Sequence, residues 1–170
     1  TPATMGAVTL AGNGYAKVTL GATASATVTA TGASTQGNVS AASMTSSLSN
    51  AVIDASASVA SFAITGGAGN DTLNGGLGLD IVVFSSAISA YKIQHNLSQD
   101  NWVVFDSLGD EGTDTLVDVE RIPISNTYLA LDLDGNAGVT AKILGAVLGK
   151  ESTTNKNLVG IGLSYLDAGG

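Results

Sequence analysis

The sequence contains no cysteine among its 170 residues. Disulfide frameworks, thiolate metal sites and cysteine nucleophiles are therefore excluded together. A secreted chain of this size without disulfides needs another means of stabilising its fold, and a bound metal ion is the obvious one.

Aromatic and charged residues are also scarce, at 5% and 12% of the chain. The core must therefore consist mostly of Val, Ile, Leu and Ala. Fourteen acidic residues against six basic ones give a net charge of -8. This balance repels phosphate backbones and anionic lipids, so we expect no nucleic-acid partner. No apolar run approaches the roughly 18 residues of a spanning helix, so we expect no membrane insertion.

The first 65 residues are rich in Ala, Thr and Ser, and their only charged residues are Lys17 and Asp54. The opening TPATMGAV has no initiator Met and no signal-peptide pattern, so we expect a processed chain or a piece of a longer one. Strands formed by so uncharged a segment would make a flat sheet with poorly protected edges. We expect such a sheet to stack on a neighbour in the same chain or in another copy. Short β-branched runs separated by Gly, Asn or Ser predict strands at 7–12, 16–21, 25–32, 51–56 and 61–67.

Residues 66–80 read GGAGNDTLNGGLGLD, two nine-residue units of the form G-G-x-G-x-D-x-apolar-x. Ile64, Leu73 and Val82 fall nine residues apart, at the apolar position of successive units. A constant short period predicts a solenoid in which each unit makes one short strand and one turn.

Two alternating stretches after the repeat, 90–96 and 101–107, are joined by polar residues and predict a β-hairpin. The segment from 107 to 138 then concentrates the acidic residues Asp110, Glu111, Asp114, Asp118, Glu120, Asp132 and Asp134.

The last 35 residues predict two short helices. The first has an apolar stripe, with Asp134 or Asn136 as its N-cap and Gly149 with Lys150 at its end. The second begins after the STTN segment. The two stripes are Val139, Ile143, Leu144, Val147 and Leu148, and then Leu158, Ile161, Tyr165 and Leu166.

A GGxGxD turn suits a hard cation for three reasons. Gly accepts the positive φ angles that direct successive carbonyls into one concavity. The missing side chains allow two turns to approach closely, and the Asp supplies the negative charge that oxygen-coordinated Ca²⁺ prefers. The candidate site residues are Gly66, Gly67, Gly69 and Asp71 in the first unit, and Gly75, Gly76, Gly78 and Asp80 in the second.

With Leu73 and Val82 at their apolar positions, these units resemble the calcium-binding repeats of the RTX (repeats in toxin) family. The likeness continues through GTDTLVDVERI at 112–122 and LALDLDGNAG at 129–138, and covers roughly residues 50–150. The resemblance implies a parallel β-roll, with Ca²⁺ held between stacked turns by carbonyls and Asp carboxylates. It also implies export by a type I pathway.

The small number of units departs from the family pattern. In a β-roll, consecutive turns lie on opposite sides, so the turns that stack are eighteen residues apart. Neither LSNAVI at 48–53 nor FSSAIS at 84–89 is a consensus turn, so each site must borrow ligands. We expect a well-formed site at Asp71, completed by Asp54, and a second at Asp80. The second would use serine hydroxyls and carbonyls at 56–61, or one of Asp106, Asp110 and Asp114.

Other constellations favour structural roles. DLDGNAG at 132–138 fails as an EF-hand, because Ala137 and Ile143 stand where Gly and Glu are needed. A helix N-cap is the favoured interpretation, with a lone ion held by Asp132 and Asp134 as the alternative. His95, the only histidine, fits a paired strand residue. No G-x-S-x-G elbow is present, and the acids at 110–111 have no aromatic cluster to bind a sugar, so we expect no enzyme.

The sequence thus predicts a mainly β chain in four segments: a strand region at 1–65, calcium repeats at 64–84, an acidic hairpin and strand segment at 85–134, and a helical cap at 135–170. We expect a secreted structural protein of the cell surface or extracellular matrix, an S-layer, adhesin or filament subunit, which Ca²⁺ folds after export. Self-association is the expected partnership, with a cell-surface polysaccharide as a further candidate partner. The alternative is a non-catalytic folding and secretion module of an RTX enzyme or toxin. A third hypothesis is a carbohydrate- or ice-binding Thr-rich face.

Overall fold

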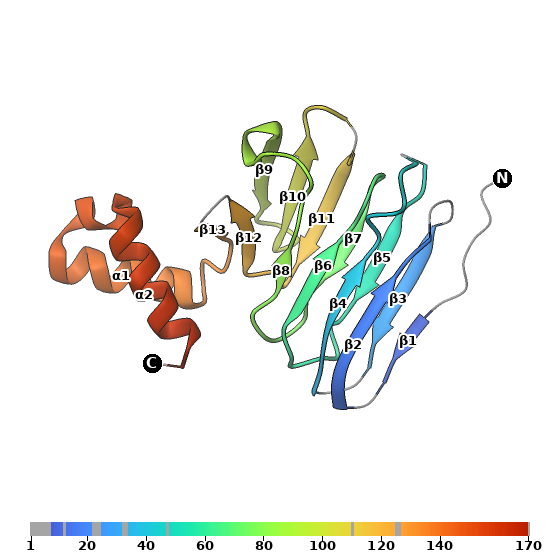
Figure 1. Cartoon of the computed structure of the whole chain (residues 1–170). Helices are drawn as coiled ribbons and strands as arrows, with labels where there is room; N and C mark the ends of the chain where they lie inside the picture. Colours follow the sequence, from blue (N-terminus) through green and yellow to red (C-terminus); the bar gives the residue numbers. More distant parts are fainter. Residues whose placement is uncertain are drawn as a thin grey trace.

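Short runs of alternating apolar residues form two sheets of mostly parallel strands, followed by two short helices (Figure 1). The computed structural model describes residues 8–11, 13–21, 25–31, 34–46, 48–109, 111–124 and 127–169. Strand β3 illustrates the pattern. Its Ala26, Val28 and Ala30 are buried, while Thr27 and Thr29 point away from the core.

Within the described residues the first sheet has seven strands, in which the last two pairings at one edge are antiparallel and the other four are parallel. In spatial order they are β1 (Val8–Leu10), β3 (Ala26–Ala30), β5 (Ala51–Asp54), β7 (Thr72–Asn74), β11 (Thr113–Val117), β10 (Asn101–Asp106) and β9 (Tyr91–Asn96).

In the part of the chain that the structure describes, the second sheet has six strands, and only the pairing at one edge is antiparallel. In spatial order they are β13 (Thr127–Ala130), β12 (Arg121–Ile124), β8 (Ile81–Val82), β6 (Phe62–Thr65), β4 (Ser34–Ser40) and β2 (Asn13–Thr19).

Consecutive strands from β1 to β8 alternate between the two sheets. Because the strands within each sheet run parallel, the turns after even-numbered strands lie on one side and those after odd-numbered strands on the other. The turn at 66–71 follows β6 and the turn at 75–80 follows β7, so the two glycine turns lie on opposite sides.

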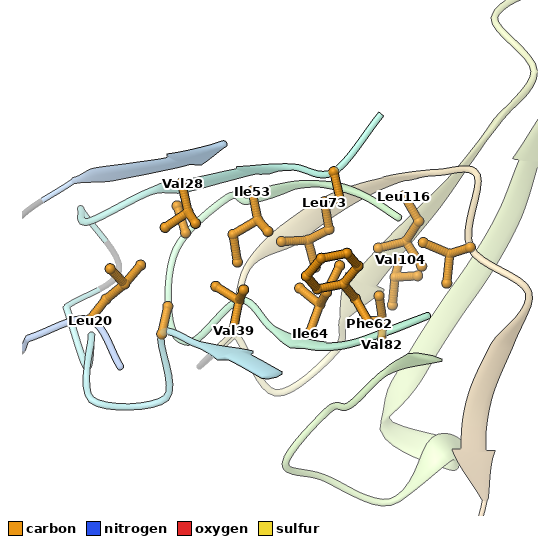
Figure 2. Packing of buried hydrophobic residues seen from close by; sticks show 14 of the residues in the cluster. Leu20, Val28, Val39, Ile53, Phe62, Ile64, Leu73, Val82, Val104 and Leu116 are labelled. Carbon is orange, nitrogen blue, oxygen red and sulfur yellow. The ribbon is translucent and has the colours of Figure 1, made fainter. Parts of the chain in front are cut away.

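The core lies between the sheets and is built from rows of residues in register (Figure 2). Ile64, Leu73 and Val82, at the apolar position of successive nine-residue units, are fully buried. One row, from the first sheet, contains Val28, Ile53, Leu73 and Leu116, and the facing row contains Val39, Ile64 and Val82.

The predicted hairpin is confirmed as β9 and β10, which pair antiparallel. Strand β4, by contrast, was not predicted, because its sequence STQGNVS lacks the alternating apolar pattern. It nevertheless pairs with both β2 and β6, so its position is set by its neighbours on either side.

Both predicted helices are present, as α1 (Asn136–Leu148) and α2 (Lys156–Asp167). Gly149 ends α1 at φ 87, as expected. The predicted N-cap is wrong, since Gly135 occupies that position without a side-chain bond. Asp132, three residues earlier, accepts from Ala137 N at 3.2 Å. Short 3-10 helices lie at η1 (Ile88–Ala90) and η2 (Lys150–Thr154).

The helices are joined to the second sheet through Arg121, which is buried on β12. Its guanidinium contacts Asp132, which precedes α1, and Asp167, the last residue of α2. The outer faces of the helices are apolar and exposed, with Val147 at 73% and Ile161 at 69%. In the described part of the chain, no helix has both the length and the apolar character needed to cross a membrane.

Candidate metal sites at the two glycine turns

The first glycine turn, residues 66–71, is held between two other turns of the chain. Strand β7, which follows it, pairs with β5 on one side and β11 on the other. Asn70 N donates to Asn50 Oδ1 at 3.1 Å, and Thr113 N donates to Asn70 Oδ1 at 2.8 Å. Amide side chains thus connect three turns in register.

Asp71 takes part in a second series of hydrogen bonds between turns, in which the earlier turn donates to the later one. Its Oδ1 accepts from Ala51 N, in the preceding turn, at 2.7 Å. Its own N donates to Asp114 Oδ1, in the following turn, at 2.8 Å. Asp71 Oδ2 is buried and has no hydrogen-bond partner among the described residues.

The glycines of this turn allow it to approach neighbouring oxygen atoms closely. Gly67 has φ 90, and a Cβ there would overlap the carbonyl oxygen of Ala41. A Cβ at Gly66 would overlap Asp71 Oδ2, and one at Gly69 would overlap the carbonyl oxygen of Ser49. Carbonyl and carboxylate oxygens therefore surround the positions where side chains are missing.

The second glycine turn, residues 75–80, repeats this arrangement on the opposite side. Asp80 Oδ1 accepts from Phe62 N at 2.6 Å, and Asp80 N donates to Glu120 Oε2 at 2.6 Å. Asp80 Oδ2 is likewise buried without a partner in the described part of the chain.

The glycines of the second turn meet equivalent oxygens. Gly76 has φ 84, and a Cβ there would overlap the carbonyl oxygen of Ala55. A Cβ at Gly75 would overlap the carbonyl oxygen of Asp118. At Gly78, which has φ 134, a Cβ would lie 3.2 Å from the carbonyl oxygen of Ala60.

Both turns bring together carboxyl groups whose pKa values are raised by burial. Burial raises the pKa of Asp71 to about 7 and that of Asp80 to about 8. Burial also raises the pKa of Asp114 to about 8, and the nearby Asp71 carboxylate adds to the effect. The pKa of Glu120 is raised mainly by burial. Within the described residues, none of these four groups forms an ion pair.

The structure places Asp54 opposite Asn74 rather than beside Asp71. The step between stacked turns on this side is 20 residues, as the bond from Ala51 to Asp71 shows, and not the expected eighteen. The expected step does hold on the other side, between Phe62 and Asp80. Asp54 Oδ1 instead accepts from Ser56 N at 3.0 Å.

Two of the acids expected near Asp80 belong to the first turn. Asp114 binds Asp71 N, and Asp106 is buried with its Oδ2 accepting from Glu111 N at 3.0 Å. Asp110 lies outside the described residues. The acids beside Asp80 are instead Glu120 and Asp118, which the sequence interpretation did not assign to this site.

A sequence signal for Asp114 was present in GDEGTD at 109–114. Its Gly109, Gly112 and Asp114 match the first, fourth and sixth positions of the GGxGxD turn. The register of Thr115 with Thr72 places this partial copy directly on the first turn. The hairpin inserted between β8 and β11 separates the matching aspartates by 43 residues, which hides the repeat.

A groove of about 590 Å³ lies beside the second turn, next to the hairpin and the start of α1. Trp102 lines it and is stacked on His95, with ring centroids 4.6 Å apart, as expected for a paired histidine. Asp132 and Asp134 also line it. The acidic residues of the groove are Asp100, Asp118, Glu120, Asp132, Asp134 and Asp167.

Within the described residues, no group of three or more His, Cys, Asp or Glu side chains is arranged to hold a metal ion. A cation at either turn would therefore need backbone carbonyl oxygens in addition to carboxylates, which is a usual ligand set for Ca²⁺.

Comparison of the chain with protein-family models, with curated proteins and with solved structures finds no match.

Proposed function

We propose that this chain is a non-catalytic, calcium-dependent structural protein of the cell surface or extracellular matrix. Its fold would be a β-roll of the RTX type, and Ca²⁺ would stabilise that roll after type I export. The alternation of consecutive strands between two parallel sheets supports the roll. The GGxGxD units supply the family resemblance.

One observation carries the proposal. Within the described residues, Asp71 Oδ2 and Asp80 Oδ2 are both buried without a partner, each in a glycine turn that lies close to carbonyl oxygens of a neighbouring turn. A buried, unpartnered carboxylate oxygen is costly. A divalent cation would remove that cost, because it supplies the missing positive charge and a ligand partner for the oxygen. The donor set fits Ca²⁺ for this reason.

At the first turn, Asp71 would hold the ion together with carbonyls of that turn and of the neighbouring turn at 41–49. The acids Asp114, Asp106 and Glu111 lie close enough to interact electrostatically there. At the second turn, Asp80 would be the carboxylate ligand, with Glu120 and Asp118 adding negative charge. Carbonyls of 55–60 border that turn.

Calcium would act as a folding switch. Without a cation, the buried carboxylates of each cluster repel one another and disfavour the fold. A ligand that binds only the folded state adds RT ln(1 + [L]/Kd) to its stability. Extracellular calcium modules have Kd values on the order of 10⁻⁴ to 10⁻³ M, so the chain would fold outside the cell and not inside it.

Calorimetric titration with CaCl₂, together with circular dichroism, tests the proposal. We expect wild type to bind calcium and to gain β signal. Asp71→Asn and Asp80→Asn should each lose one ion. Glu151→Gln is the matched control, because Glu151 is exposed on η2, outside both glycine turns, and it should keep the wild-type ion count. Absence of calcium binding by the wild-type chain would reject the proposal.

The second candidate function is a folding and secretion module of an RTX enzyme or toxin. The exposed apolar faces of α1 and α2 favour it, because a further part of such a protein would cover Val147, Ile161 and Tyr165. Electron microscopy separates the two functions. Calcium-dependent sheets or fibres of the chain would support the structural role. A calcium-folded particle that never assembles would support the module.

A further inference from the structure

At one end of the stack, the first sheet has β1 as its edge strand and the second sheet has β2 (Figure 1). In the part of the chain that the structure describes, no strand pairs with the outer edge of either one. Open edges expose rows of unpaired N–H and C=O groups, and these are templates for pairing with another strand.

Strand β2 offers the longer of the two edges, with seven residues. Leu20 N donates to Ser40 O, so the backbone groups of even-numbered residues point towards β4. Backbone groups alternate in direction along a strand. The groups of Tyr15, Lys17 and Thr19 therefore point outwards. On β1, Leu10 O accepts from Thr31 N, so the backbone groups of Thr9 point outwards.

This end of the molecule differs in charge from the rest. Strands β1 to β4 contain a single charged residue, Lys17, although the chain has a net charge of -8. Two copies of so acidic a chain repel each other over most orientations. They meet the least repulsion when their neutral ends face each other.

Two copies of β2 could pair in several ways, and the position of Lys17 favours one of them. In a parallel pairing of two β2 strands in register, Lys17 would lie beside Lys17. In an antiparallel pairing centred on Ala16, Lys17 of each copy lies opposite Tyr15 of the other, and both side chains are exposed on the same face. An ammonium group beside an aromatic ring is an attractive pair.

We propose that two copies of this chain associate head to head through antiparallel pairing of β2 with β2 and of β1 with β1. The dimer is closed, because the contact is isologous and uses up both open edges of this end. The inference goes beyond the calcium function and does not depend on it, since no proposed ligand lies in β1 to β4.

Sedimentation equilibrium of the full chain in calcium, from micromolar to millimolar concentration, tests the pairing. We expect a monomer–dimer equilibrium for wild type. Lys17→Pro should abolish the dimer, because proline removes an outward N–H that an edge strand does not need within the monomer. Lys17→Thr keeps that N–H and should still dimerise. Unchanged circular dichroism of both variants would show that the fold is retained.

A second variant keeps the backbone intact. Tyr15→Lys sets lysine opposite lysine at two places, so the dissociation constant should rise about tenfold at low salt and recover at high salt. A wild-type chain that stays monomeric would overturn the proposal. So would a Lys17→Pro variant that still dimerises, or open-ended growth through this end.

Discussion

Both carboxylate oxygens of Asp167 accept from Arg121 Nη2, at 2.8 and 2.9 Å, although the two residues are 46 positions apart. Arg121 Nη1 donates to Asp132 and to the carbonyl oxygen of Glu120. One buried guanidinium therefore joins β12, the segment before α1 and the end of α2. It also lies next to Glu120, which binds the second glycine turn.

Replacing this arginine should release the helices. Arg121→Met leaves the carboxylates of Asp132 and Asp167 without their cation, and breaking a buried pair in this way costs about 3 kcal/mol. We expect faster amide hydrogen exchange across 136–167, while strands β3 to β8 stay protected. Lys92→Met, on the exposed face of β9, is the matched control and should exchange like wild type. Equal helix protection in Arg121→Met and wild type would contradict the role of the clamp.

Asp71→Asn should change the free energy of unfolding with opposite signs in the two metal states. The amide oxygen can still accept from Ala51 N. In chelator at about pH 8 the variant should be more stable than wild type, because ionising a buried carboxyl above its raised pKa costs free energy. In saturating calcium it should be less stable. Urea unfolding in both buffers measures this, and the same sign in both would count against a cation at Asp71.

The metal-free protein should lose stability as pH rises. Asp71, Asp80 and Asp114 have folded-state pKa values of about 7, 8 and 8, above their ordinary value of 3.8. A carboxyl with a raised folded-state pKa stabilises the fold fully below its unfolded pKa. That stability is lost as pH rises through the folded pKa. As pH rises from about 4, the unfolding free energy should therefore fall, up to about pH 7 for the contribution of Asp71 and up to about pH 8 for those of Asp80 and Asp114.

Calcium should remove this decline, because bound cation favours the ionised carboxylates, and protons should compete with calcium as the pH falls. Urea unfolding across this range, in chelator and in calcium, gives the comparison. A metal-free protein that becomes more stable towards pH 8 would show that these carboxyls are not held in a costly environment.

Two glycine-to-alanine changes should have opposite effects on the free energy of unfolding. Gly67→Ala places a Cβ at φ 90 and against the carbonyl oxygen of Ala41, so we expect a loss of more than about 1 kcal/mol. Gly160→Ala, in α2, meets no atom within 4 Å and should gain up to about 1 kcal/mol from helix propensity. Thermal unfolding of both variants in calcium measures the pair. A Gly67→Ala protein as stable as wild type would mean that the first turn is not closely stacked.

The sequence predicted those parts of the fold in which local pattern and burial agree. The nine-residue spacing identified Ile64, Leu73 and Val82, and all three lie in the core. The alternation of apolar and polar residues in 90–96 and 101–107 predicted the hairpin. Strand β4 escaped prediction because its pairing with β2 and β6, rather than its own residues, makes it a strand.

For the two candidate sites, the sequence predicted only the residues of the GGxGxD motif. Asp71 and Asp80 were identified from the motif, but their neighbours depend on loop lengths that the motif does not contain. The turn between β5 and β6 is longer than a consensus turn, so the step from Ala51 to Asp71 is 20 residues and Asp54 lies out of register with Asp71. The inserted hairpin brings Asp114 to Asp71 and leaves Glu120 for Asp80.

The hydrogen bonds that Asp71 forms with Ala51 and Asp114 also indicate an order of events in folding. The bond from Ala51 N to Asp71 closes a separation of 20 residues, whereas the bond from Asp71 N to Asp114 closes 43. Closing the longer loop costs about 0.6 kcal/mol more for each doubling of length, and the intervening hairpin must form before it closes. We therefore expect β5 to pair with β7 before the 109–114 turn docks on the other side of the 66–71 turn. The turn at 66–71 would then be enclosed on both sides only in the final step of folding.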